Sequence, residues 1–173
     1  DAVRELKEAG ITKVVMMTGD SERTAAAIAK RVGVDEYYSE VLPEDKASFV
    51  EKEKELGHKV IMIGDGINDS LALSSASVGI AISDGAAIAR EIADVTISAD
   101  NLHEIVTLKR LSTALMKRIH NNYRTIIGIN GGLIALGVTG IIMPTTSALL
   151  HNMSTLTISL RSMRNLLPKE EEA

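Results

Sequence analysis

The sequence predicts an α/β domain with a parallel sheet, followed by a two-helix transmembrane hairpin. Short apolar runs alternate with helical patterns over the first hundred residues, which is typical of βαβ units. The stretch 125–160, by contrast, contains no Asp, Glu, Lys or Arg. We therefore expect four parts: an α/β domain over 1–100, a linking helix over 101–124, the hairpin over 125–160 and a cytosolic tail over 161–173.

Composition excludes some classes of protein. The chain has 173 residues, a net charge of -4, 2% aromatic residues and no cysteine. Without cysteine it forms neither disulfides nor thiolate metal sites. An acidic chain without aromatic residues among basic ones is not typical of nucleic-acid binders, so we expect no nucleic-acid partner.

The strands and helices of the domain follow in order. The first residues already show a helical pattern, so we expect the domain to be incomplete at its N-terminus. Residues 13–17 and 59–63 are predicted to be buried parallel strands, with further short strands at 78–82 and 95–97. A helix from Ser21 to Arg31 and one from Pro43 to Gly57 lie between them, since Ser and Pro favour helix starts and Gly favours helix ends.

Two of these strands run directly into Gly and Asp. "MMTGD" places Thr18, Gly19 and Asp20 at a strand end, and "GDGINDSLAL" places Asp65 and Asp69 behind another. The carboxyl ends of parallel strands share one edge of the sheet, where glycine and free N–H groups favour a phosphate. Paired carboxylates beside a phosphate require a divalent cation, which indicates Mg²⁺. Either stretch alone is explained as well by turn and cap residues.

The three motifs together resemble one known family. "TGD" at 18–20, "PEDK" at 43–46 and "GDGINDSLAL" at 64–73 resemble the phosphorylation domain of P-type ATPases, within the haloacid-dehalogenase-like superfamily. The resemblance implies that ATP is the substrate and that an aspartyl phosphate forms. Phosphoryl transfer depends mainly on positioning and charge stabilisation, which suits this set of residues.

The resemblance also implies roles for the residues of these motifs. Asp65 is expected to hold Mg²⁺, with Asp69 supporting it. Asn68 is expected to contact the phosphoryl group, and Thr18 and Gly19 to bind the same group.

Two further residues gain roles in the same way, and one essential part is missing. Lys46 is expected to neutralise phosphoryl charge, although a solvated lysine in a charged helix is the simpler explanation of that residue alone. Asp20 is expected to act near the nucleotide. The family's "DKTGT" nucleophile motif is absent from the sequence. The chain therefore resembles the C-terminal portion of a pump and is expected to need the pump's remaining domains as partners.

The charge-free region has the length of a hairpin in a bilayer. Thr125 to Met143 approaches the roughly 20 residues that span a hydrocarbon core. Pro144 then interrupts the chain, and the second helix, up to Leu160, is more polar and can span only if its polar side faces other helices. The competing interpretation is a buried helical hairpin in a soluble protein.

Flanking charges predict the orientation of this hairpin. Basic residues lie on both outer sides, whereas the link between the helices has none. The positive-inside rule then puts both outer ends and the α/β domain in the cytosol of a multi-pass protein, with the lipid bilayer as a partner and the cell membrane as the expected location. The basic residues are Lys109, Arg110, Lys117, Arg118, Arg124, Arg161, Arg164 and Lys169.

Polar residues inside the hairpin are candidate ligands of a transported ion. Asn130 lies near the middle of the first helix, and His151, Asn152, Ser154 and Thr155 cluster in the second. Polar groups at membrane depth are costly and often functional, and imidazole favours transition metals. Hydrogen bonding between the helices is the alternative role, especially for Ser154 and Thr155.

The hairpin narrows the resemblance to the heavy-metal-transporting (type IB) subgroup. That subgroup has Asn or Lys at the position of Asn130, and "HNMST" at 151–155 is similar to its "HEGGT" motif of cobalt- and zinc-type pumps. The stretch also aligns with the Met-x-x-Ser-Ser motif of copper pumps. The resemblance implies ATP-driven export of a divalent transition metal of the Zn, Co, Mn or Fe type. Two alternatives remain: a soluble haloacid-dehalogenase-like phosphatase, and a non-catalytic membrane interaction module.

Overall fold

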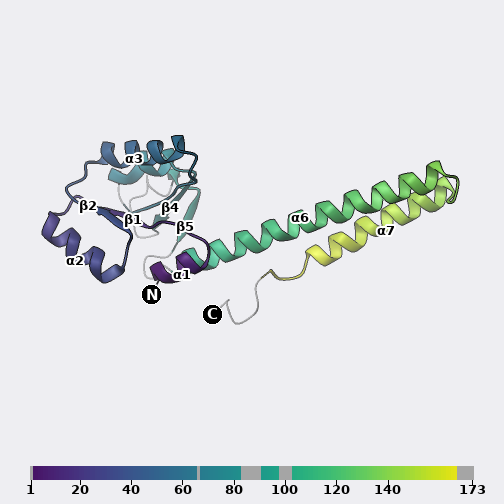
Figure 1. The fold of residues 1–173 in the computed structure, drawn as a ribbon, viewed down its shortest axis with the longest axis horizontal. Coiled ribbons are helices and arrows are strands. Elements are labelled where there is room, and N and C mark those ends of the chain that lie inside the picture. Colours follow the sequence, from purple (N-terminus) through teal and green to yellow (C-terminus); the bar gives the residue numbers. More distant parts are fainter. Residues whose placement is uncertain (1, 66, 83–90, 98–102, 167–173) are drawn as a thin grey trace. The chain divides into compact units, whose positions relative to one another are not determined.

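The computed structural model describes residues 2–65, 67–82, 91–97 and 103–166 (Figure 1). It divides the chain into two compact units, Asp1–Val106 and Thr107–Ala173. The first unit contains α1 (Ala2–Glu8), β1 (Val15–Met17), α2 (Glu22–Val32), β2 (Glu36–Tyr38), α3 (Pro43–Glu55), β3 (Ile61–Gly64), the 3₁₀ turn η1 (Ile67–Asp69), α4 (Ser70–Ser75), β4 (Val78–Ile82) and β5 (Val95–Ile97).

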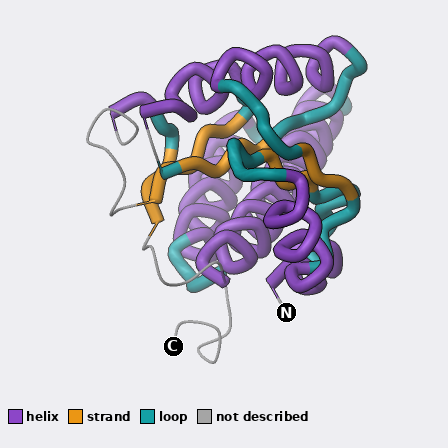
Figure 2. The backbone as a smooth tube through the Cα atoms, turned by 90° about the vertical axis from the view of Figure 1, so that its left-hand side faces the viewer, coloured by secondary structure: helices purple, strands orange, loops and turns teal. Residues whose placement is uncertain are grey.

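All strand pairs of the first unit are parallel, as predicted. Within the described residues they form two sheets, β1–β2 and β3–β4–β5. In Figures 1 and 2, α3 lies over one face of the strands and α2 lies toward the other. Among the described residues, β1 and β2 are the edge strands of the first sheet, and β3 and β5 are the edge strands of the second.

The two predicted helices begin and end where their sequences indicate. Ser21 is the N-cap of α2, and Gly33 ends this helix with φ of 80°, a backbone conformation that glycine adopts without a steric penalty. Pro43 occupies the first turn of α3, and the Asp45 carboxylate accepts a hydrogen bond from the N–H of Leu42 at 3.1 Å. The Ser21 side chain makes no capping hydrogen bond, so the local chemistry that is visible lies at the C-terminal end of α2 and the N-terminal end of α3.

Strand β2 is the element that the sequence prediction missed. Its three residues, Glu36–Tyr38, are all exposed, so they show no alternation between apolar and polar positions. The predicted burial of the two early strands was also wrong in degree, because β1 is half-buried and in β3 the buried residue is Gly64.

The core of the first unit lies under α3 and α4. Leu73 and Ile80 are almost fully buried, and Val50 of α3 packs with Ala47 and Ala72. Burial of such side chains contributes roughly 1.5–3 kcal/mol each. This packing holds Lys46 and the η1 turn against the carboxyl end of β3.

The second unit is a hairpin of two long helices. The predicted linking helix and first hairpin helix are one continuous helix, α6 (His103–Val138), whose first turn belongs to the first unit, and α7 (Pro144–Ser162) follows after a turn at Gly140, whose φ is 71°. Among the described residues, no helix is both long enough and apolar enough to cross a membrane.

Asp35 supports a testable prediction about acid stability. Its carboxylate accepts hydrogen bonds from Lys7 Nζ at 2.5 Å and from the N–H of Val14 at 2.8 Å, and these bonds, the lysine first, lower its pKa. Stability from a lowered carboxyl pKa is present above the unfolded value, near 3.8, and is lost as pH falls through the folded pKa.

We therefore expect Asp35→Asn to reduce stability slightly at pH 7 and to have a smaller effect in strong acid, at a pH below the lowered folded pKa, where the native carboxyl is protonated too. Urea unfolding at both pH values measures this difference. Glu8→Gln is the control, since Glu8 has a looser 3.9 Å contact with Arg4. An equal effect of Asp35→Asn at both pH values would contradict the electrostatic account.

Candidate functional site

The clearest feature of the predicted phosphate edge is an ion pair between α3 and η1. Lys46 Nζ donates to Asp69 Oδ1 at 2.7 Å, and the two side chains are 14% and 11% exposed. A largely buried pair of opposite charges is stable only while both members are present. The structure thus brings two of the predicted site residues together, and Lys46 is not the freely solvated lysine of the simpler explanation.

Gly64 explains how the Asp69 carboxylate reaches the end of β3. A Cβ added at Gly64 would lie 2.6 Å from Asp69 Cβ and 2.9 Å from its Oδ2. The Asp69 side chain therefore occupies the space that any other residue at position 64 would fill. Asp65 follows Gly64 directly and is exposed, so the two carboxylates belong to the same strand end.

This arrangement fits the expected magnesium ion. Mg²⁺ prefers carboxylate oxygens, keeps several waters and commonly completes its octahedron with substrate phosphate, so it needs one or two protein carboxylates. Asp65 offers an exposed carboxylate, and Lys46 already neutralises part of Asp69. Among the described residues no group of three or more His, Cys, Asp or Glu forms a closed metal site. An open, partly hydrated site is the type that this donor set can form.

The second predicted group, Thr18 to Asp20, forms a closed turn after β1. Thr18 Oγ1 donates to Asp20 Oδ2 at 3.0 Å and accepts from the N–H of Asp20 at 3.1 Å. The neighbouring loop supports this turn, because the N–H groups of Val41 and Glu40 donate to the carbonyls of Thr18 and Asp20. The Thr18 hydroxyl must exchange its bond to Asp20 before it donates to a phosphoryl oxygen.

Gly19 within this turn has no packing reason to be glycine. A Cβ built there meets only the carbonyl oxygen of Val41, at an ordinary 3.8 Å, and its φ is not in the left-handed region. Close approach of a ligand to the backbone is a second reason for glycine. Asn68, also exposed, has no recorded side-chain contact within the described part of the chain, and none is recorded between the two predicted groups.

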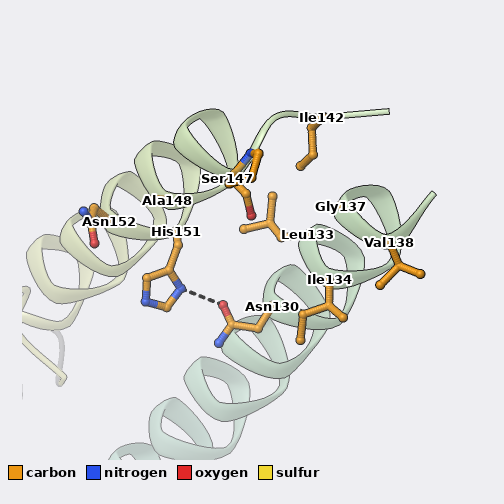
Figure 3. A pocket seen from close by; sticks show the side chains of 11 residues that line it. Asn130, Leu133, Ile134, Gly137, Val138, Ile142, Ser147, Ala148, His151 and Asn152 are labelled. Carbon is orange, nitrogen blue, oxygen red and sulfur yellow. Dashed lines mark hydrogen bonds between the residues drawn. The ribbon is translucent and has the colours of Figure 1, made fainter. Parts of the chain in front are cut away.

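The hairpin unit contains the second predicted site (Figure 3). His151 Nδ1 and Asn130 Oδ1 lie 2.8 Å apart, in a pocket of about 660 Å³ between α6 and α7 that Asn152 also lines. With the amide oxygen facing the ring, Nδ1 is the donor of this hydrogen bond, and Nε2 is the ring nitrogen that it does not use. The imidazole nitrogen that could bind a metal is therefore Nε2, and Asn130 orients the ring.

Ser154 and Thr155 do not connect the two helices. Their hydroxyls donate to the carbonyl of His151, one turn back in their own helix, at 2.8 and 3.1 Å. These two bonds lie within α7, so hydrogen bonding between helices stays a prediction for Ser154 and Thr155.

Comparison with known proteins gives consistent results for both units. A haloacid dehalogenase-like hydrolase family model matches residues 1–77. A zinc-exporting P-type ATPase of Mycobacterium marinum is 36% identical over 95% of this chain and 22% of its own length. A copper-exporting P-type ATPase of Bacillus subtilis is 39% identical over 94% of this chain and 20% of its own length.

A solved structure matches over both units as well. The crystal structure of a zinc-transporting PIB-type ATPase in its E2.Pi state aligns with 96% of this chain and 27% of that chain, at 32% identity and a TM-score of 0.88. The chain belongs to the heavy-metal P-type ATPases. It spans about a fifth of the length of the curated relatives that it matches.

In this P-type ATPase chain, sequence reasoning missed a cluster beside the Thr18 turn. Glu22 accepts hydrogen bonds from Ser39 Oγ at 2.5 Å and Tyr37 Oη at 2.8 Å, and these bonds, the serine first, lower its pKa. Glu40 follows with φ of 52°, an uncommon conformation for a residue with a Cβ. No motif indicated this cluster, because its members lie on different elements, α2 and the end of β2.

The Lys46–Asp69 pair gives a prediction for this ATPase chain. We expect Lys46→Met to lower the free energy of unfolding by about 2–3 kcal/mol, because it leaves a buried carboxylate without its charged partner. Adding Asp69→Asn should restore part of that loss. Urea denaturation measures both, and Lys52→Met, an exposed lysine of the same helix, is the control. Equal costs for Lys46→Met and Lys52→Met would show that the pair contributes nothing.

Gly64 and Gly19 give a matched pair of substitutions. Gly64→Ala must displace the Asp69 carboxylate and is expected to cost about 1–3 kcal/mol of stability. Gly19→Ala has room for its methyl group and is expected to stay within about 0.5 kcal/mol of the native protein. Thermal unfolding compares them directly, and a neutral Gly64→Ala would refute the proposed close contact.

Proposed function

We propose that this chain is part of a pump that exports a divalent transition metal at the expense of ATP, through an aspartyl-phosphate intermediate. The observation that carries this proposal is the presence in one chain of two separate sites. One is the Lys46–Asp69 pair at the end of β3, and the other is the His151–Asn130 pair between α6 and α7. A soluble phosphatase needs only the first, and a simple membrane module needs neither.

At the first site, each residue receives a role that its geometry supports. Asp65 is the exposed carboxylate for Mg²⁺, which when bound shields the negative charge of the transferring phosphoryl group. Lys46 holds Asp69 in place and adds positive charge beside that group. Thr18, Gly19 and Asn68 bind the phosphoryl oxygens, and Asp20, which shares a turn with Thr18, acts near the nucleotide.

The split sheet supports a nucleophile supplied from outside this chain. Within the described residues β1 pairs with β2 and β3 pairs with β4, so β1 and β3 each keep an edge without a strand partner. Unpaired strand edges favour the addition of another strand. We infer that the strand bearing the phosphorylated aspartate pairs there, between the Thr18 turn and Asp65, so the remaining domains of the pump complete the site.

The hairpin unit supports an intramembrane ion site shared with other helices. Large apolar side chains on both helices are exposed, among them Val138, Ile134 and Leu160 at 84%, 67% and 59%. These faces suit lipid or further helices better than water. We propose that α6 and α7 lie in the bilayer against other helices of the longer protein, which compensates for the polar side of α7, with the first unit in the cytosol.

His151 Nε2 is the metal ligand that this chain contributes most directly. Asn130 orients it, and Asn152, Ser154 and Thr155 supply weaker oxygen donors near the same pocket. Zinc-type sites take four ligands, so the rest must come from helices outside this chain. Both zinc- and copper-exporting relatives are similar to the chain. We therefore infer that the complete set of ligands, including those from other helices, determines the choice among Zn, Co, Mn and Fe.

The catalytic role of Asp65 is tested in the full-length protein. We expect metal-stimulated ATP hydrolysis that vanadate inhibits, and a loss of about 100-fold or more in Asp65→Ala, since a site for transition-state charge is removed. Glu44→Ala, another exposed carboxylate of this unit, is the control. Undiminished hydrolysis in Asp65→Ala would defeat the magnesium assignment. A reading frame without "DKTGT" upstream would favour a non-catalytic membrane module.

The transport role of His151 is tested separately. His151→Ala is expected to abolish metal stimulation while phosphorylation from inorganic phosphate persists, because the phosphate site lies in the other unit. His120→Ala is the matched control, since His120 is an exposed histidine of α6 that bonds to its own helix at Met116. Unchanged metal dependence in His151→Ala would leave this histidine with a structural role alone.

A further inference from the structure

Arg118 of α6 holds the end of α7 through three hydrogen bonds. Its Nη1 donates to the carbonyls of Ser162 at 2.9 Å and Arg164 at 2.5 Å, and its Nη2 donates to the carbonyl of Asn165 at 3.0 Å. The partners are the last residue of α7 and the segment directly after it. Arg118 thus binds the backbone at the C-terminal end of α7.

The chemistry of this contact is specific to arginine. The last carbonyls of a helix have no partner within the helix and carry partial negative charge, so a cation is favourable there. The planar guanidinium presents several donors at fixed angles, whereas a lysine ammonium cannot reach three spread carbonyls in the same way. The sequence has no Asp or Glu from 105 to 169, so the backbone takes the place of a carboxylate partner in this segment.

Asn122 extends the contact by one helical turn. Its Nδ2 donates to Ser162 Oγ at 2.8 Å, and that hydroxyl donates in turn to the carbonyl of Ile158. Arg118 and Asn122 are four residues apart, so they lie on the same face of α6. Both are partly buried against α7, in a segment where most of their neighbours are exposed.

The polar contacts between the helices therefore occur at two separate levels. Asn122 and Asn130 are eight residues apart on α6, and His151 and Ser162 are eleven apart on α7, which at 1.5 Å per residue corresponds to roughly 12 and 16 Å. Two contacts at different heights fix both the sliding and the rotation of one helix on the other. A slip of one turn would move His151 by about 5.4 Å, beyond the reach of Asn130.

We propose that Arg118, assisted by Asn122, is a positioning residue that sets the register in which His151 meets Asn130. The register itself is a property of the hairpin. Its consequence for metal binding rests on the proposed function, so the two are tested by different measurements.

Cysteine cross-linking tests the register. The chain has no cysteine of its own, so Asn130→Cys can be combined in turn with His151→Cys, Ser147→Cys or Thr155→Cys, the last two lying one turn away on either side. These substitutions remove the upper contact, so the Arg118 contact alone must hold the register. With a short bifunctional thiol reagent, we expect the 130–151 pair to give the highest yield of intramolecular cross-link.

Arg118→Ala should abolish this preference, so that the cross-link yield of the 130–147 or the 130–155 pair rises to that of the 130–151 pair. Arg118→Lys should behave like Arg118→Ala, because the charge alone is insufficient, and Asn122→Ala should give a smaller shift of the same kind. Lys117→Ala, at the adjacent exposed position, is the control. An unchanged preference in Arg118→Ala, or full rescue by lysine, overturns the proposal.

Metal activation of the full-length protein tests the consequence. We expect Arg118→Ala to raise the metal concentration for half-maximal activation by about 10-fold or more, as loss of an orienting residue does, with phosphorylation from inorganic phosphate retained. A shifted cross-link pattern without a change in metal activation overturns the link between the register and the metal site. Loss of phosphorylation as well would overturn the positioning role, since it would indicate general misfolding.

Discussion

The ion pair between Lys46 and Asp69 is the contact on which the proposed phosphate edge of the first unit depends. Each charge is largely removed from water, so each needs the other. The pair draws α3 and the start of α4 to the same strand end, and the apolar packing of Val50, Ala72 and Leu73 behind it supports that position. This position of Asp69 requires glycine at position 64, because the Asp69 side chain occupies the space where a Cβ would lie. Asp65, which follows Gly64, is an exposed carboxylate at the same strand end.

Local patterns predicted much of this unit and failed where the decisive information was not local. The caps of α2 and α3 depend on neighbouring residues, so Ser21, Gly33 and Pro43 were sufficient to place them. Strand β2 has three exposed residues and no alternation, so it exists because β1 and the Thr18 turn pair with it. Periodicity also identifies strands without identifying their partners, which is why the division into two sheets was not foreseen.

The hairpin shows the same limit at longer range. The charge-free stretch indicated two helices and a break at Pro144, yet it could not show that α6 continues unbroken from the linking segment. The contacts that hold the helices together join Arg118 with residues 44 to 47 positions later in the chain. A hydrogen bond from an arginine to backbone carbonyls leaves no signature in the sequence of the carbonyl side. The polar motif around His151 was visible, whereas its orientation was not.

The orientation of His151 bears on the proposed metal site. Sequence reasoning treated Asn130, His151, Asn152, Ser154 and Thr155 as candidate ligands, and the hydrogen bond between Asn130 Oδ1 and His151 Nδ1 leaves Nε2 as the ring nitrogen open to a cation. One imidazole nitrogen favours many transition metals to similar degrees, so it cannot select among them. Selection requires the number, softness and geometry of the remaining ligands. Zinc- and copper-exporting relatives are both similar to this chain. Under the proposed function, the ligands that other helices supply would therefore decide which ion is exported.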